Sequence, residues 1–457
     1  KNYRRKSLDL KFDSKFIKVI FKMFSRWITL FLLFISLTGC SSYSSKHKQS
    51  LIIPIHDDPV AFSPEQAKRA MDLSIAQLLF DGLTRETHRE SNDLELAIAS
   101  RYTVSEDFCS YTFFIKDSAL WSDGTPITSE DIRNAWEYAQ ENSPHIQIFQ
   151  GLNFSTPSSN AITIHLDSPN PDFPKLLAFP AFAIFKPENP KLFSGPYTLV
   201  EYFPGHNIHL KKNPNYYDYH CVSINSIKLL IIPDIYTAIH LLNRGKVDWV
   251  GQPWHQGIPW ELHKQSQYHY YTYPVEGAFW LCLNTKSPHL NDLQNRHRLA
   301  TCIDKRSIIE EALQGTQQPA ETLSRGAPQP NQYKKQKPLT PQEKLVLTYP
   351  SDILRCQRIA EILKEQWKAA GIDLILEGLE YHLFVNKRKV QDYAIATQTG
   401  VAYYPGANLI SEEDKLLQNF EIIPIYYLSY DYLTQDFIEG VIYNASGAVD
   451  LKYTYFP

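Results

Sequence analysis

Strand patterns and helix patterns alternate along most of this chain, and this alternation constrains its fold more than any other feature. Short apolar or alternating runs bounded by turn residues predict strands, whereas apolar residues spaced three or four apart predict helices. The predicted strands cover residues 51–55, 111–115, 161–166, 196–203, 207–211, 226–232, 247–250, 279–284, 345–349 and 372–376. The predicted helices cover residues 65–82, 236–242, 295–313 and 352–370, with a further one after Thr128. This order predicts a mixed α/β protein.

Local signals support several of these element boundaries. Asp123-Gly124 predicts a turn, because both residue types favour turn backbone. Thr128 followed by Asp131 has the spacing of a capping box, in which each side chain bonds the other residue's backbone N–H. Gly371 is expected to end the helix before it. The polar, proline-rich stretch 325–344 predicts a loop.

A short apolar run near the start of the chain predicts a secretion signal. Trp27–Leu37 is almost wholly apolar and follows Lys18, Lys22 and Arg26. It has the length of a signal-peptide core, whereas a membrane span needs about 20 apolar residues. The run ends in Leu37-Thr38-Gly39-Cys40, which resembles the lipobox of bacterial lipoproteins. The alternative is an ordinary transmembrane anchor that contains a cysteine by chance.

The lipobox resemblance implies that residues 1–39 are a signal peptide and that Cys40 carries acyl chains such as palmitate. Two or more acyl chains hold a protein firmly on a bilayer. Residues 40–50 would then be a tether to the cell envelope, facing the periplasm or the exterior. Met23 is the first methionine, so residues 1–22 are interpreted as an upstream extension.

The charge balance argues against nucleic acid as a partner. The chain has 46 basic and 49 acidic residues; nine basic and two acidic residues precede Cys40, which leaves 37 basic and 47 acidic, a formal charge of −10. Nucleic-acid-binding proteins usually carry a basic stripe instead.

No motif points to an enzyme, a metal or a cofactor. The sequence has no Walker loop, no GxSxG, no HExxH and no Cys/His spacing typical of metal sites. A secreted hydrolase remains an alternative, with Glu412 and Glu413 as a carboxylate pair, but this pair lies in a charge run typical of a solvated surface. The expectation is therefore a protein without catalytic residues, metal or cofactor.

One stretch resembles a known family closely. Residues 112–137 read TFFIKDSALWSDGTPITSEDIRNAWE, which resembles the signature of the extracellular solute-binding proteins of family 5, the peptide/nickel-binding family. Further segments that fit this family are LLFDGLTRET (78–87), SGPYTLVEYFPGHNIHLKKNPNYYD (194–218), FWLCLNT (279–285), RHRLATCIDKRSIIEEALQG (296–315), RIAEILKEQWKAAGIDLIL (358–376) and IIPIYY (422–427).

The resemblance implies a two-lobe periplasmic-binding-protein clamshell of type II, cluster C, with mixed β-sheets flanked by helices. Lobe I would comprise residues 51–275 and the C-terminal return 421–457, and lobe II residues 276–420. Such proteins are monomeric receptors of ABC importers. They close on an oligopeptide and deliver it to a membrane permease with its ATPase subunits.

The same resemblance implies where a ligand would bind. The family's contact positions correspond here to Lys68, Ala70, His145, Trp280, Cys282, Gly400, Ala402, Tyr403 and Tyr404. Three of these depart from the family pattern, and the first two are Tyr403, which stands where an acidic residue binds the peptide amine, and Gly400, which stands where a tryptophan is usual. Lys68 also places a cation where an acid is typical.

A second departure concerns the length of lobe II. Between Tyr404 and Pro424 the chain has only PGANLISEEDKLLQNFEII, where the family has a long helix-rich stretch. Lobe II is therefore expected to be shortened. An alternative function follows, namely a surface lipoprotein that has kept this fold and lost transport.

Overall fold

The computed structural model describes residues 49–87, 94–259, 269–313, 317–325, 344–434 and 437–457. The predicted signal peptide and Cys40 lie outside the described residues, as does most of the predicted loop 325–344. Among the described residues, no helix is both long enough and apolar enough to span a bilayer.

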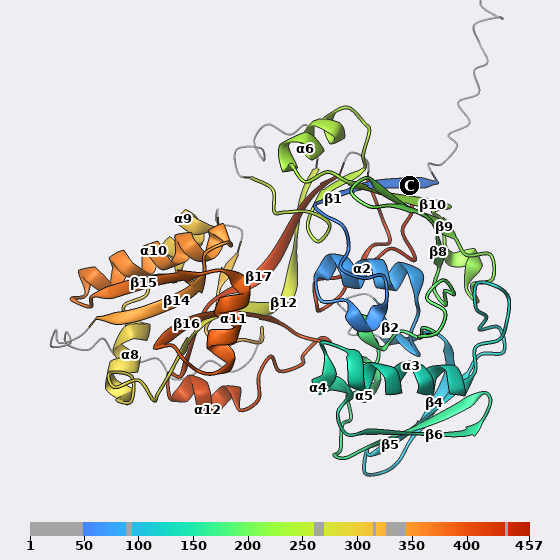
Figure 1. Cartoon of the computed structure of the whole chain (residues 1–457), viewed down its shortest axis with the longest axis horizontal. Helices are drawn as coiled ribbons and strands as arrows, with labels where there is room; N and C mark the ends of the chain where they lie inside the picture. Colours follow the sequence, from blue (N-terminus) through green and yellow to red (C-terminus); the bar gives the residue numbers. More distant parts are fainter. Residues whose placement is uncertain (1–48, 88–93, 260–268, 314–316, 326–343, 435–436) are drawn as a thin grey trace, which may run out of the picture. The chain divides into compact units, whose positions relative to one another are not determined.

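Two four-stranded sheets form the part of the molecule that is named the first lobe here (Figure 1). In one sheet, β1 runs parallel to β10, and the other neighbours are antiparallel. Its strands in spatial order are β1 (Ser50–Ile55), β10 (Ser226–Ile231), β9 (Asn207–Lys212) and β8 (Tyr197–Phe203). The other sheet is antiparallel, in the order β4 (Ala99–Val104), β5 (Ser110–Ile115), β7 (Ala161–Leu166) and β6 (Leu152–Ser158).

Helices fill the space around these two sheets. In α2 (Ala70–Leu79), every residue after Ala70 is buried, so this helix forms part of the core rather than of its surface. Ile132, Ala135, Trp136 and Ala139 are the apolar residues that α3 (Ser129–Asn142) buries. Shorter elements of this lobe are η1 (Pro64–Gln66), β2 (Thr84–Glu86), β3 (Leu94–Leu96), α4 (Ile146–Phe149), α5 (Phe173–Leu176), η2 (Pro180–Phe182), η3 (Tyr219–Cys221) and α6 (Ile235–Asn243).

A larger mixed sheet contains the two longest strands, β12 (His269–Leu283) and β17 (Ile422–Thr434). They pair antiparallel from end to end, with a register shift between Pro274 and Ala278. Beyond the shift, β12 pairs with β16, and the strands that complete the sheet are β11 (Trp249–Gly251), β13 (Gln318–Pro319), β14 (Leu345–Pro350), β15 (Leu374–Leu379) and β16 (Ile395–Val401).

The second lobe, as named here, consists of β13–β16, the adjoining halves of β12 and β17, and five helices (Figure 1). The helices are α8 (Leu293–Thr301), α9 (Lys305–Ala312), α10 (Leu354–Ala369), α11 (Tyr381–Lys389) and α12 (Glu413–Gln418). Only the short α12 lies between Tyr404 and Pro424. The final strands of the chain are β18 (Ile442–Tyr443) and β19 (Val449–Asp450).

The mixed α/β class is confirmed, and most predicted strands are present. The turn at Gly124 has a positive φ of 88°, and the Thr128–Asp131 capping box forms. The start predicted for helix 65–82 is wrong, because η1 comes first and Ala67 is extended before α2 begins. The predicted helix 295–313 is two helices, since the Asp304 side chain accepts hydrogen bonds from the N–H groups of Arg306 and Ser307 and starts α9.

The predicted lobe boundaries remain a prediction. The register shift between Pro274 and Ala278 lies at the expected change from lobe I to lobe II. The backbone N–H of Glu276 donates to the Ala445 carbonyl (3.0 Å), and its carbonyl accepts from Ala402 (2.6 Å). The irregular segment between Pro274 and Ala278 is therefore hydrogen-bonded on both sides.

A buried ionic network ties the C-terminal return to the first lobe. Arg85 pairs with Asp81 (Nη2 to Oδ1, 3.0 Å) and with Asp450, and all three side chains are almost fully buried. The Tyr216 hydroxyl also donates to Asp81 (2.7 Å). Burial by itself raises the pKa of Asp81, but the charges of Arg85 and Lys452 outweigh burial and lower this pKa below its usual value.

Replacing Arg85 should therefore be costly. Arg85→Met keeps the apolar volume but leaves Asp81 and Asp450 buried without their cation. The free energy of unfolding in urea should fall by about 3–5 kcal/mol. The matched control is Arg306→Met on the exposed side of α9, which should change it by less than about 0.5 kcal/mol. Equal effects of the two substitutions would show that the network is not stabilising.

Candidate functional site

Four of the predicted ligand-binding residues lie in one group at the contact of the two lobes. The segment Ala67–Ala70 leads from η1 into α2, and the Nε2 group of His145 donates a hydrogen bond to the Ala67 carbonyl (2.7 Å). The rings of His145 and Tyr403 meet edge to face, with centroids 6.0 Å apart. Lys68, Ala70, His145 and Tyr403 are therefore neighbours, although they come from three distant parts of the sequence.

Tyr403 is a residue of the second lobe that contacts the first. It follows β16, and its ring packs edge to face on Phe179, with centroids 4.9 Å apart. The Gln147 side-chain amide donates a hydrogen bond to the Tyr403 hydroxyl. Burial raises the pKa of Tyr403, so its hydroxyl stays protonated. A phenol in this position offers a ligand a neutral hydrogen bond and no charge.

The position of Tyr404 resembles that of Tyr403 in one respect. Its side chain is half-buried, and burial raises the pKa of its hydroxyl. The nearby charge of Asp172, in the first lobe, adds to this rise. Tyr404 is therefore a second neutral hydroxyl that the same loop holds near the first lobe.

The electrostatics of the group are set by Lys68 and His145. Burial lowers the pKa of His145, and the positive charge of Lys68 lowers it further, while the bond to the Ala67 carbonyl opposes both. His145 is thus neutral at pH 7, with its Nε2 proton committed to Ala67. Lys68 is exposed and remains the cation of the group.

The backbone N–H and carbonyl of Lys68 are available for hydrogen bonds to a ligand. Among the described residues, neither its N–H nor its carbonyl has a hydrogen-bond partner, and its ammonium group has no ion-pair partner. The residues on either side are extended, with φ/ψ of −67°/123° at Ala67 and −81°/150° at Arg69. Lys68 therefore presents an unpaired N–H and an unpaired carbonyl between two extended residues.

A small pocket of about 220 Å³ lies next to this segment. Ala70, the first residue of α2, lines it together with Arg69, His56, Gln252, Trp254 and Tyr430. Arg69 is held in place by Asp57 (2.7 Å) and Asp72 (2.8 Å). The volume suits one side chain of a ligand rather than a whole drug-sized molecule, for which pockets of about 300–1,000 Å³ are usual.

The other predicted contacts lie on the sheet of the second lobe. Trp280 is 1% exposed and packs in a cluster with Ala278, Leu323, Leu417 and Ile422. Burial raises the pKa of the Cys282 thiol to about 11. A ligand role for Trp280 and Cys282 stays a prediction, and in this structure Trp280 is a core residue.

Gly400 and Ala402 also have structural roles. A Cβ atom on Gly400 would lie 2.8 Å from the Trp280 ring, so the indole fills the space above this glycine. Ala402 is buried and bonds the bulge at Glu276. These two residues shape the strand that leads to Tyr403.

Gln147 and Phe179 were not predicted from the sequence. Gln147 lies two residues after His145, and this proximity was the only available signal for it. Phe179 lies in a loop outside the quoted family segments, and no motif indicates it. Cys109, Cys221, Cys282, Cys302 and Cys356 form no disulfide, and no group of three metal-ligating side chains exists within the described ranges.

Comparisons with known proteins agree with this architecture. The family model for bacterial extracellular solute-binding proteins, family 5 Middle, matches residues 93–411. The oligopeptide-binding protein OppA of Bacillus subtilis is 26% identical, over 82% of this chain and 81% of that protein. The periplasmic murein peptide-binding protein MppA of Escherichia coli is 24% identical, over 78% and 76% respectively.

Solved structures are similar in fold. The Escherichia coli murein tripeptide binding protein MppA superimposes with a TM-score of 0.72 at 20% identity, covering 90% of this chain and 98% of that one. The two-lobe architecture expected from the sequence is thereby confirmed.

The electrostatic coupling of Lys68 and His145 can be measured directly. Removing the charge in Lys68→Gln should raise the pKa of His145 toward its ordinary value, because one cause of its depression is lost. The readout is the pH titration of the imidazole carbon and nitrogen shifts by NMR. Lys246→Gln is the control and should leave the titration of His145 unchanged. A lower pKa for His145 in Lys68→Gln would contradict the geometry described.

Proposed function

The chain belongs to family 5 of the bacterial extracellular solute-binding proteins, and we propose that it is a peptide receptor of an ABC importer. It binds oligopeptides or peptide-like solutes between its two lobes and delivers them to a membrane permease with ATPase subunits. The relatives named above bind oligopeptides and murein peptides, which supports this class of ligand. The observation that carries the proposal is the unpaired N–H and carbonyl of Lys68, between two extended residues and near His145, whose ring contacts Tyr403.

The main chain of an extended peptide needs N–H and carbonyl groups in the site as hydrogen-bond partners. Lys68 offers one of each, and Ala70 opens the small pocket to a ligand side chain. Tyr403 would cover the ligand from the second lobe. Binding in this scheme is non-covalent and needs no cofactor or catalytic residue.

The charges of the site bear on specificity. Where an acidic residue would bind a free peptide amine, the chain has the neutral Tyr403, and nearby it has the cation Lys68. A buried amine that lacks its carboxylate loses a charge-assisted hydrogen bond of about 1.5–3 kcal/mol. We therefore propose ligands with a blocked amine or an additional carboxylate, as cell-wall peptides have, with Lys68 as the anion partner and His145 as a neutral neighbour.

A peptide pair tests both function and specificity. Calorimetry with one tripeptide that carries an extra carboxylate, free and N-acetylated, should show binding of both forms within about tenfold of each other. Tyr403→Ala should weaken both forms at least about tenfold, because the cover over the ligand is lost.

The control is Tyr381→Ala on α11, whose side chain is 47% exposed. It should bind both peptides like the unmodified protein. Binding of the free form more than about tenfold tighter would show that another carboxylate holds the amine. If neither this pair nor a mixed peptide pool binds, the alternative of a receptor-like lipoprotein without transport gains support.

We propose further that the protein is a monomer anchored to the cell envelope by acylated Cys40. The ordered signal from Lys18 to Cys40 supports this. In Cys40→Ser, labelled fatty acid should no longer be incorporated and the protein should leave the membrane fraction. Ser45→Ala in the tether is the control. Undiminished labelling of Cys40→Ser would contradict the anchor.

A further inference from the structure

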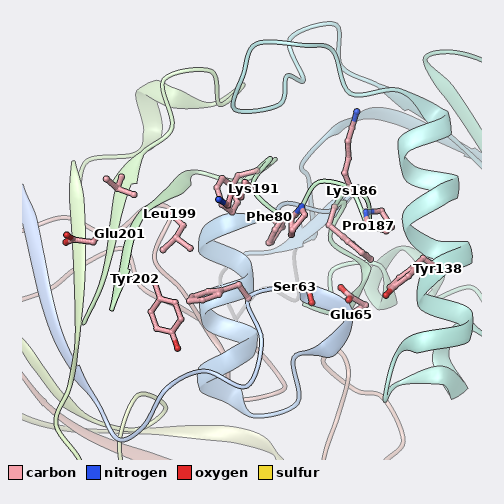
Figure 2. Close-up of a pocket in the computed structure, with 15 residues that line it drawn as sticks. Ser63, Glu65, Phe80, Tyr138, Lys186, Pro187, Lys191, Leu199, Glu201 and Tyr202 are labelled. Atoms are coloured by element: carbon pink, nitrogen blue, oxygen red, sulfur yellow. The ribbon is translucent and has the colours of Figure 1, made fainter. Parts of the chain in front are cut away.

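A second and larger pocket lies wholly within the first lobe (Figure 2). It has a volume of about 820 Å³ and lies among η1, the end of α2, α3, β8 and the loop 185–193. This size falls within the range of small-molecule sites, about 300–1,000 Å³. None of the residues proposed above as peptide contacts lines it.

Six of the fifteen residues that line the pocket are aromatic. Phe62 packs edge to face on Tyr202 with centroids 5.0 Å apart, and Phe80 lies against Phe193 at 5.6 Å. Tyr138 contacts Phe185 from α3 (6.0 Å) and is 41% exposed. Aromatic faces attract both apolar groups and cations, because the ring centre carries partial negative charge.

Glu65 is the unusual residue in this wall. Its side chain is 4% exposed, and its buried Oε2 atom has no hydrogen-bond partner among the described residues. Burial raises the pKa of this carboxyl, and weaker hydrogen bonds from its own backbone N–H and from Ser63 oppose the rise. A buried polar atom without a partner costs about 1–3 kcal/mol, so the oxygen is suited to accept a hydrogen bond from a ligand.

The backbone holds Glu65 in this position. Pro64 begins η1, and the Glu65 carbonyl accepts a hydrogen bond from the Ser143 hydroxyl (2.7 Å). Figure 2 shows the Glu65 carboxyl between Ser63 and Tyr138, with the ring of Phe80 nearby. Glu65 thus lines the same pocket as the aromatic side chains.

Among the described residues, no charged side chain at the pocket forms an ion pair with Glu65. The Lys186 ammonium pairs with Asp131 (3.1 Å), and in Figure 2 it points away from the other labelled side chains. Lys191 and Glu201 are exposed and have opposite charges. A ligand that reaches Glu65 therefore meets one carboxyl group and aromatic rings.

From this arrangement we infer that the pocket binds an apolar molecule that carries an ammonium group. The ammonium would donate a hydrogen bond to Oε2 of Glu65 and lie against the Tyr138 ring, while the apolar body would contact Phe62, Phe80 and Leu199. A neutral alcohol satisfies the oxygen less well, and a carboxylate would be repelled by it. This site is separate from the proposed peptide site. Glu65 lines this pocket, whereas Lys68, three residues later, does not line it and belongs to the proposed peptide site.

The test compares three probes of equal chain length on the purified full chain. Calorimetry at pH 7.5 and low salt should show n-octylamine binding at least about tenfold tighter than 1-octanol or octanoate. In Glu65→Gln the affinity for octylamine should fall about ten- to a hundredfold, with little change for octanol. Binding of octylamine should also weaken as the pH is lowered, because Glu65 becomes protonated.

Matched variants locate the effect. Glu201→Gln removes an exposed carboxylate at the same pocket and should leave the octylamine affinity within about twofold, as should Tyr403→Ala at the peptide site. Tyr138→Ala should weaken octylamine more than octanol, because it removes a cation–π contact. Circular dichroism establishes that each variant is folded.

Three outcomes would overturn the inference. They are octanoate binding as tightly as octylamine, unchanged octylamine binding by folded Glu65→Gln, and the absence of octylamine binding to the unmodified protein. Each is independent of the peptide experiments, which probe Lys68 and Tyr403 instead.

Discussion

The antiparallel pairing of β12 with β17 is the interaction on which the two-lobe structure depends. The strands are 15 and 13 residues long, and they pair from His269–Thr434 at one end to Cys282–Ile422 at the other. One half of the pair adjoins β11 near the first lobe, and the other half adjoins β16 in the second. The break in register at Pro274–Ala278 lies between the two halves, and β-bulges of this kind bend and twist a strand. A change in the angle between the lobes therefore requires the paired strands β12 and β17 to bend or twist.

The sequence allowed the class and most single elements to be predicted, but it did not reveal this ladder. The apolar segment at residues 279–284 was recognised as a strand because it is short and apolar. The preceding residues 269–274 include Tyr271, Tyr273 and Pro274, and their strand character comes from pairing with residues more than 150 positions away. Local patterns carry no information on such a partner. The helix predicted from residue 65 failed for a related reason, since tertiary bonds to Glu65 and Ala67 stabilise a turn and an extended segment in its place.

The candidate site shows the same division between local and distant information. The family resemblance gave Lys68, Ala70, His145 and Tyr403, which the structure brings together. It did not give Gln147 or Phe179, because Gln147 takes part through its contact with Tyr403, and Phe179 through its contacts with Tyr403 and His145. Trp280 illustrates the opposite case: its ring occupies the space above Gly400, so a position expected to contact ligand is filled by the core of the second lobe. A glycine on one strand and a large indole on its neighbour thus complement each other in volume.

The segment from Pro64 to Ala70 shows how one short loop serves two pockets. Its shape is fixed from both sides, since Ser143 bonds the carbonyl of Glu65 and His145 bonds that of Ala67. With two of its carbonyls held by neighbouring residues of one turn, the loop has little freedom at Lys68, whose own N–H and carbonyl are left unpaired within the described residues. Free main-chain groups that are already held in extended geometry cost a ligand less ordering entropy than groups on a flexible loop. The same two bonds that hold the segment carrying Glu65 therefore also restrict the Lys68 backbone, on which the proposed peptide site depends.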